Sequence, residues 1–250
     1  SQSWETADSL EVLKDIARKW GDSFGIVNVV WSSISRITDN GLFLRAGSEI
    51  GVATTKAFSA QMLCGLMLSL FFASKRDLWS ARLQRIVNDI QHLPGLLEQI
   101  LELSDDIRSI AEEFAEYEDV FFLWRHYMYP IALECSLKFK EISYVHSEAF
   151  PSAELKHGQL ALVEEKFPSV ILMPKDDFFQ KNHSTLQEVR ARKWRVLAIS
   201  DALVEDADWQ IRIPSINSPE LYPFLVVLAG QLLSYHVADI LGRDIDKPRN

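Results

Sequence analysis

The sequence predicts an α/β protein built on parallel sheets with helices on both faces. From residue 120 onward, short apolar runs rich in β-branched residues alternate with helix-like segments at the spacing of strand–helix–strand units. The runs are apolar throughout rather than alternating, which is typical of strands buried on both faces of a sheet. A chain of 250 residues is long enough for one large domain or two smaller ones.

Local patterns predict each element in turn. Helical periodicity covers residues 7–19, and an apolar run at 24–30 predicts a buried strand. A short strand and a glycine-containing loop then lead into a long apolar helix at 57–74, and Leu and Ile at helical spacing predict a helical connection over 77–116. Beyond it we expect strands at 120–124, 169–174 and 195–200, an edge strand at 209–214, and helices at 129–144, 177–192 and 221–241.

The apolar segment at 57–74 has about the minimum length for a membrane span. It contains Gln61 and several serines, and it directly continues a polar motif. We therefore expect a buried core helix here and no membrane partner.

The charge and cysteine content restrict the class of protein. Lys and Arg total 26 against 35 Asp and Glu, which gives a formal net charge of -9, and no basic run stands out. Nucleic acid is therefore not an expected partner, whereas a small anionic substrate needs only a few local donors. Cys64 and Cys135 form no metal-binding pattern, and we interpret them as reduced thiols of a cytosolic protein.

The stretch SQSWET at residues 1–6 has the chemistry of a phosphate-binding loop. It runs directly into a predicted helix, whose free N–H groups and dipole would favour an anion. Its hydroxyls and amide come from Ser1, Gln2, Ser3 and Thr6. Such loops normally contain glycine, which lets the backbone approach the phosphate, yet Trp4 stands in the middle of this one.

A second candidate group could move a proton between adjacent carbons. Lys138 and Glu141 are three residues apart on a predicted helix and so share a face. A carboxylate can serve as base and then acid, and a nearby cation can stabilise the developing oxyanion. His157 has a side chain that titrates near neutral pH and suits the opening of a sugar ring. By spacing alone, a solvated ion pair and a turn histidine are the commoner interpretations.

Four stretches together resemble a known family. They are SQSxETADSL at 1–10, GSEIGVATTKAFSAQ at 47–61, PIALECSLKFKEISYVHSEAFPSAELKHGQLALV at 130–163 and DIDKPRN at 244–250. In this order and spacing they resemble the isomerase part of the glutamine–fructose-6-phosphate aminotransferases (glucosamine-6-phosphate synthases). That part is built from two sugar isomerase (SIS) domains, and the resemblance runs over essentially the whole chain.

The resemblance implies an SIS-type fold with a partial first domain at residues 1–76 and a nearly complete second domain at 77–250. It implies an aminotransferase and isomerase that makes glucosamine 6-phosphate from fructose 6-phosphate and glutamine, toward UDP-N-acetylglucosamine. The family is cytoplasmic and dimeric and needs no metal or organic cofactor, because the substrate carbonyl is its own electron sink.

The resemblance also implies roles for individual residues. The phosphate would be held by Ser1, Gln2, Ser3 and Thr6, and the sugar would be contacted by Val52 and Thr54. Glu141 would shuttle the proton between C1 and C2, with Lys138 close by. His157 would open the sugar ring in the site of the neighbouring subunit.

The chain departs from the family pattern at both ends. The glutaminase domain, the first half of the first SIS domain and a C-terminal tail that carries a lysine are not among these residues. We therefore expect the chain as written to be inactive or incomplete on its own. The alternative function is a non-catalytic sugar-phosphate-binding SIS module, or an inactive fragment.

Tryptophan replaces glycine or a tight turn of the family pattern at Trp4, Trp31, Trp124 and Trp194, and Trp20 occupies a natural glycine position at a helix end. A tryptophan is costly wherever the backbone needs a positive φ. Our hypothesis is that these five positions are glycines encoded by a reassigned stop codon. The alternative is a decayed or altered copy with a blocked phosphate loop.

Overall fold

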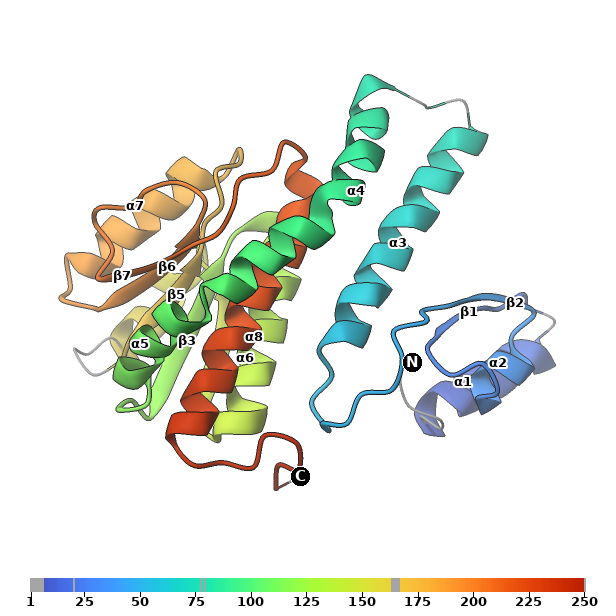
Figure 1. The fold of residues 1–250 in the computed structure, drawn as a ribbon, viewed down its shortest axis with the longest axis horizontal. Coiled ribbons are helices and arrows are strands. Elements are labelled where there is room, and N and C mark those ends of the chain that lie inside the picture. Colours follow the sequence, from blue (N-terminus) through green and yellow to red (C-terminus); the bar gives the residue numbers. More distant parts are fainter. Residues whose placement is uncertain (1–6, 20, 77, 79, 163–166, 250) are drawn as a thin grey trace. The chain divides into compact units, whose positions relative to one another are not determined.

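The computed structural model describes residues 7–19, 21–76, 78, 80–162 and 167–249 (Figure 1). The chain forms two compact units, Ser1–Ser80 and Ala81–Asn250, and each is described here by itself. Both units contain a parallel sheet and helices, so the predicted α/β class is confirmed.

The first unit is a small parallel sheet with three helices. Strands β1 (Phe24–Val27) and β2 (Asn40–Phe43) pair in parallel, with Phe24 opposite Asn40. Helix α2 (Ser33–Ile37) connects them, and the Ser32 hydroxyl accepts the Ser35 N–H at its start. Helices α1 (Ala7–Arg18) and α3 (Lys56–Lys75) lie before and after the two strands in the sequence.

The apolar helix α3 is not the buried core helix that the sequence suggests. Its buried residues are Ala57 and Leu70, whereas the side chains of Met67, Phe71 and Phe72 are each more than half exposed. A two-stranded sheet offers too little apolar surface to cover a helix of this length, so the expectation of full burial is wrong. By length and composition alone, α3 and the segment Pro219–Ile240 could each cross a membrane, and the second of these is mostly buried.

The second unit opens with two helices, α4 (Ala81–Glu102) and α5 (Ser104–Phe114), which meet at Leu103 where one continuous helical stretch was expected. A five-stranded parallel sheet follows, in the order β4-β3-β5-β6-β7. Its strands are β3 (Asp119–Trp124), β4 (His146–Pro151), β5 (Ser169–Leu172), β6 (Val196–Ser200) and β7 (Trp209–Arg212). The remaining helices are α6 (Tyr129–Ser143), α7 (Phe179–Arg190) and α8 (Tyr222–Ile240), with short 3₁₀ turns η1 (His126–Met128), η2 (Leu155–His157), η3 (Gln159–Leu162) and η4 (Pro219–Leu221).

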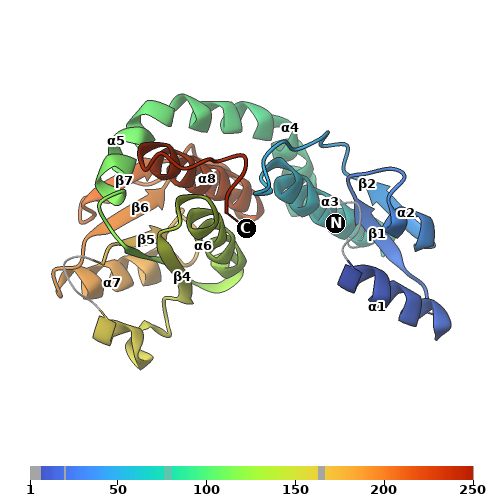
Figure 2. The ribbon, with the colours of Figure 1, turned by 90° about the horizontal axis from the view of Figure 1, so that it is seen from below.

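Helices cover both faces of this sheet. Helices α6 and α8 lie against one face, and α7 covers the other (Figures 1 and 2). The central strands are buried almost completely, with Val120 to Trp124 of β3 at 1% exposure or less. Their continuous apolar sequence follows from this double burial, as the sequence pattern predicted.

Strand β4 was not predicted from the sequence. Its residues His146, Ser147 and Glu148 are polar, and it ends in a proline. A segment with this composition lacks the apolar run that predicts a buried strand. Strand β4 lies at the edge of the sheet beside β3, where polar side chains and proline are tolerated. Polar edge strands therefore limit prediction from apolar runs.

The described tryptophans do not carry the backbone strain that we expected of them. Trp31, Trp124 and Trp194 are absent from the positive-φ residues, although Lys193 and His126 nearby have φ of 63° and 59°. The expectation of a strained backbone is therefore wrong at these three positions. Near Trp194 and Trp124, the left-handed conformation is adopted by Lys193 and His126 instead. Trp4 and Trp20 lie outside the described residues.

Two of these tryptophans nevertheless have unusual environments. Trp124 and Trp194 are fully buried, and the indole N–H of each lacks a hydrogen-bond partner within the described part of the chain. Buried indoles normally find a partner. Glycine at the two positions would remove these unpaired N–H groups, so the recoding hypothesis predicts glycine-containing peptides in the native protein by mass spectrometry. Peptides with tryptophan at 124 and 194 would refute the recoding hypothesis.

Helices α6 and α8 pack at very short distance through Gly230. A Cβ atom placed on Gly230 would lie 2.5 Å from the Cys135 sulfur. We expect G230A to lower the stability of the second unit by about 1–3 kcal/mol through overpacking, measured as a lower Tm in thermal unfolding. The control is G95A in α4, where a Cβ meets no atom within 4 Å. Alanine lowers the conformational entropy of the unfolded chain, so this variant should be slightly more stable than the wild type. Equal Tm values for the two variants would contradict this account of the packing.

Candidate active site

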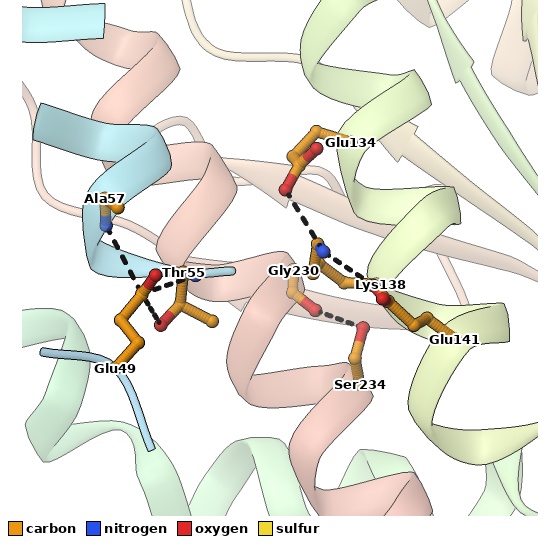
Figure 3. Close-up of polar contacts among 8 residues, drawn as sticks. All are labelled: Glu49, Thr55, Ala57, Glu134, Lys138, Glu141, Gly230 and Ser234. Carbon is orange, nitrogen blue, oxygen red and sulfur yellow. Dashed lines mark hydrogen bonds and ion pairs between the residues drawn. The ribbon is translucent and has the colours of Figure 1, made fainter. Parts of the chain in front are cut away.

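Three charged side chains gather on one face of α6. The Lys138 Nζ lies 2.6 Å from Glu141 Oε2 and 3.8 Å from Glu134 Oε1 (Figure 3). All three are largely buried, with side-chain exposures of 6% for Lys138, 16% for Glu141 and 11% for Glu134. The predicted Lys138–Glu141 pair is thus in direct contact, and it is not a solvated surface pair.

Glu134 is the member of this group that the sequence analysis missed. It precedes Lys138 by one helical turn, so the three residues occupy the same helix face. Burial raises the pKa of the Glu134 carboxyl, Lys138 counteracts this, and Glu141 adds to it. The shift follows mainly from the removal of the carboxyl from water, which disfavours its charged form. The i, i+4, i+7 spacing of Glu134, Lys138 and Glu141 was the sequence signal that could have identified it.

The opposite side of α6 is fixed to the sheet by hydrogen bonds. The Ser147 hydroxyl of β4 donates to the carbonyl of Ser136 at 2.7 Å, and the two hydroxyls are 3.2 Å apart. The Lys140 ammonium donates to the Ser147 carbonyl at 3.1 Å. Together with the close contact of Cys135 with Gly230 in α8, these bonds restrict movement of α6. The charged group is therefore held in place by its supporting elements.

Helix α6 ends at Ser143, shortly after Glu141. Tyr144 adopts a left-handed conformation with φ of 65° and donates its N–H to the Lys140 carbonyl. Its hydroxyl accepts the N–H of Arg249 at 2.9 Å. The guanidinium groups of Arg243 and Arg249 lie 5.2 and 4.8 Å from its ring centroid. The segment after α8 is thus attached to the end of the helix that carries Lys138 and Glu141.

His157 lies in a different setting from Glu141. It closes the 3₁₀ turn η2, its side chain is exposed, and Gly158 beside it has a φ of 145°. The imidazole makes no hydrogen bond, ion pair or ring contact within the described part of the chain. Within this chain, the structure does not bring His157 together with Lys138 and Glu141.

The other histidine of this region is part of a polar cluster on β4. His146 lies 2.6 Å from Asp119 and 3.9 Å from Glu148, and all three are well exposed. Among the residues that the structure describes, no group of three or more His, Cys, Asp or Glu side chains could hold a metal ion.

In the first unit, the loop that contains Val52 and Thr54 is ordered by Glu49. The Glu49 Oε1 accepts the N–H groups of Thr55 at 2.9 Å and Ala57 at 3.3 Å, at the start of α3 (Figure 3). Its other oxygen, Oε2, is buried and has no partner within the described residues. Glu49, which was not among the residues predicted from the sequence, satisfies free N–H groups at the N-terminus of this helix.

Val52 and Thr54 lie in the segment between this carboxylate and the helix. Val52 is 55% exposed, and the start of the loop is held by Asn28, whose side-chain amide donates to the Gly47 carbonyl at 2.6 Å. The candidate phosphate-binding residues Ser1, Gln2, Ser3 and Thr6 lie outside the described residues.

Comparison with known proteins places this geometry in a family. The SIS domain family model matches residues 113–240, which is just over half of the chain. The glutamine–fructose-6-phosphate aminotransferase (isomerizing) of Thermus thermophilus is 41% identical over 255 aligned residues, and that of Methanosarcina mazei is 43% identical over 257. Each match covers all of this chain, and the chain spans 42% and 41% of the length of these relatives.

A solved structure agrees with the sequence comparison. The C-terminal domain of glucosamine-fructose-6-phosphate aminotransferase from Francisella tularensis superimposes with a TM-score of 0.93 at 37% identity. The match covers 99% of this chain and 71% of that domain. The chain therefore belongs to the SIS-domain family, as part of the C-terminal isomerase region of the glutamine–fructose-6-phosphate aminotransferases.

Proposed function

We propose that the chain is the isomerase portion of a cytoplasmic enzyme that makes glucosamine 6-phosphate from fructose 6-phosphate and glutamine. The observation that carries this proposal is the buried contact between Lys138 and Glu141. Burying charged side chains is costly unless they are paired, and proteins seldom keep such a group where a packed apolar one would be at least as stable. A base and a cation held this close suit proton transfer through an enediol.

In this proposal, Glu141 removes a proton from one sugar carbon and returns it to the adjacent carbon. The ammonium of Lys138 stabilises the negative charge that develops on the neighbouring oxygen. Glu134 keeps Lys138 oriented, because its carboxylate is the second group within 4 Å of the ammonium. The raised pKa of Glu134 limits how strongly it competes with the substrate for this cation.

The other roles in the proposal come from the family. Ser1, Gln2, Ser3 and Thr6 hold the phosphate, and Val52 and Thr54 contact the sugar. His157 opens the sugar ring in the site of a second copy of the chain, in a homodimer. The exposed position of His157 on η2 supports this assignment, since a side chain that serves a neighbouring subunit needs to face outward.

Replacing Glu141 tests the proposed base. E141Q keeps the size of the side chain and most of its hydrogen bonding, but it cannot accept the proton. We expect kcat for the C1/C2 proton exchange to fall by about 10²–10⁴-fold in the complete gene product, with KM little changed. KM should change little because the phosphate is held by other residues. The control is E98Q, at an exposed position of α4. Normal exchange in E141Q would contradict the role of Glu141, and sugar-phosphate binding without exchange in the unaltered protein would favour the non-catalytic module.

The pKa of Glu134 predicts a pH-dependent stability. The folded protein holds the proton of Glu134 more tightly than the unfolded protein does, because the folded-state pKa lies above the ordinary value of 4.5. This contribution to stability is complete at acidic pH and is lost as the pH rises through the raised pKa. The unfolding free energy of the wild type, relative to E134Q, should therefore fall as the pH rises from about 4.5, the ordinary pKa, through the raised pKa of the folded protein.

The measurement is a series of denaturant titrations across this pH range, with E98Q as the control for an exposed carboxylate. The difference between wild type and E98Q should change much less with pH. A difference between wild type and E134Q that stays constant over the range would show that Glu134 is not perturbed in the folded protein.

A further inference from the structure

The strand order of the second sheet reverses beside β3. The chain passes from β3 through α6 to β4 on one side, and then crosses to β5 on the other side of β3. In open parallel sheets, ligands bind outside the carboxyl ends of the strands at the point where the order reverses. This point lies between the ends of β3 and β5, and therefore next to the residues that follow each strand.

A pocket of about 450 Å³ lies at this point. It is lined by His126 and Tyr127 after β3, by residues 176–178 after β5, and by Arg82, Pro219 and Glu220. All of these residues belong to the second unit. The volume falls within the range of about 300–1,000 Å³ that is usual for small-molecule sites.

One wall of the pocket is aromatic. The rings of His126 and Phe178 are stacked, with centroids 4.5 Å apart and planes at 16°, and Tyr127 lies next to His126. The ammonium of Lys181 lies 5.6 Å from the centroid of Phe178, so this wall already attracts one cation of the chain itself. An aromatic wall of this kind suits the C–H face of a sugar ring or an organic cation.

The charged groups of the pocket are mostly acidic. Glu220 pairs with Arg82. Asp176 accepts the Tyr127 hydroxyl and the Phe178 N–H at 2.9 and 2.8 Å. Asp177 is exposed at the pocket and has no hydrogen bond or ion pair within the described part of the chain. Three carboxylates against one guanidinium disfavour a phosphate and leave one carboxylate free to bind a cation.

The pocket is separate from the candidate active site. Helix α6 begins at Tyr129, directly after the residues that line the pocket, and Glu141 lies twelve residues further along it. At about 1.5 Å per residue, the two are about 18 Å apart along the helix axis. Lys138 and Glu141 lie in the second half of α6, toward the edge where the strands begin, and the pocket lies at the edge where they end. Glu134 is nearer the start of α6 but does not line the pocket.

We propose that this pocket is a second ligand site that takes a small hydroxylated amine of the amino-sugar class, without a phosphate group. The sugar face packs against His126 and Phe178, the ammonium pairs with Asp177, and the hydroxyls bind the carboxylates of Asp176 and Glu220. This site does not depend on the proposed isomerase activity, because it uses none of the residues assigned to that reaction.

The test is a calorimetric titration of the complete gene product with glucosamine, glucose and glucosamine 6-phosphate, in the presence of saturating fructose 6-phosphate. We expect glucosamine to bind saturably and at least about tenfold more tightly than the other two, since loss of a charge-assisted hydrogen bond or addition of repulsion is worth a factor of this order. The excess of fructose 6-phosphate blocks the proposed catalytic site, so a failure of one proposal does not imply a failure of the other.

Variants locate the binding. D177N should weaken the binding of glucosamine about tenfold or more, and F178A should weaken it independently by removing the aromatic wall. D106N, at an exposed aspartate of α5 outside the pocket, should bind like the wild type. E141Q should also bind glucosamine normally. Wild-type affinity in D177N, equal affinity for glucose, or tighter binding of glucosamine 6-phosphate that D177N abolishes would each overturn the proposal.

Discussion

The burial of Lys138 between two carboxylates is the constraint around which the second unit is organised. Moving each of these charges out of water costs several kcal/mol, and their mutual attraction offsets that cost only when the geometry is fixed. Burial raises the pKa of the Glu134 carboxyl, and the nearby Glu141 adds to this, while the single ammonium of Lys138 opposes it. Such a group adds little to stability relative to a packed apolar one, which is consistent with the proposed role in proton transfer.

Two neighbouring elements, β4 and α8, hold α6 and its charged side chains in a fixed position. On one side, Ser136 and Ser147 join α6 to the edge strand β4 by buried hydrogen bonds. On the other side, Gly230 allows α8 to approach Cys135 more closely than any residue with a Cβ could. Because β3 and its neighbours are buried on both faces, they provide a rigid layer against which α6 is fixed. The polar edge strand therefore supports the candidate site, although it carries none of the groups that are proposed to react.

The arrangement also separates two chemical environments along one helix. The end of α6 near Glu141 presents a cation and carboxylates that are largely buried, where electrostatic interactions are strong. The start of α6 adjoins an open, acidic and aromatic pocket at the carboxyl ends of β3 and β5. One sheet can support both environments because they lie at different ends of its strands. The reversal of strand order creates the crevice at the carboxyl ends, and the end of α6 that carries Glu141 lies toward the opposite ends.

Sequence patterns predicted the parts of the structure that depend on local repetition. The buried strands β3, β5 and β6 and the helices α6 and α8 follow from apolar runs and helical periodicity. The patterns failed where an outcome depended on distant partners. Strand β4 is stabilised by pairing with β3 and not by its own composition, and α3 stays exposed because its unit offers a narrow sheet.

The same limit applies to the sites. The spacing of Lys138 and Glu141 indicated a shared face, but the burial of that face depends on tertiary packing, which local spacing does not report. The acidic pocket joins residues 82, 126, 176 and 220 from segments far apart in the sequence, so no local motif could reveal it.

His126 shows how local backbone conformation and the tertiary site are connected. It adopts the left-handed conformation that favours glycine, with φ of 59°. Histidine tolerates this conformation better than most residues, and its side chain adds to this edge of the sheet an aromatic ring that glycine lacks.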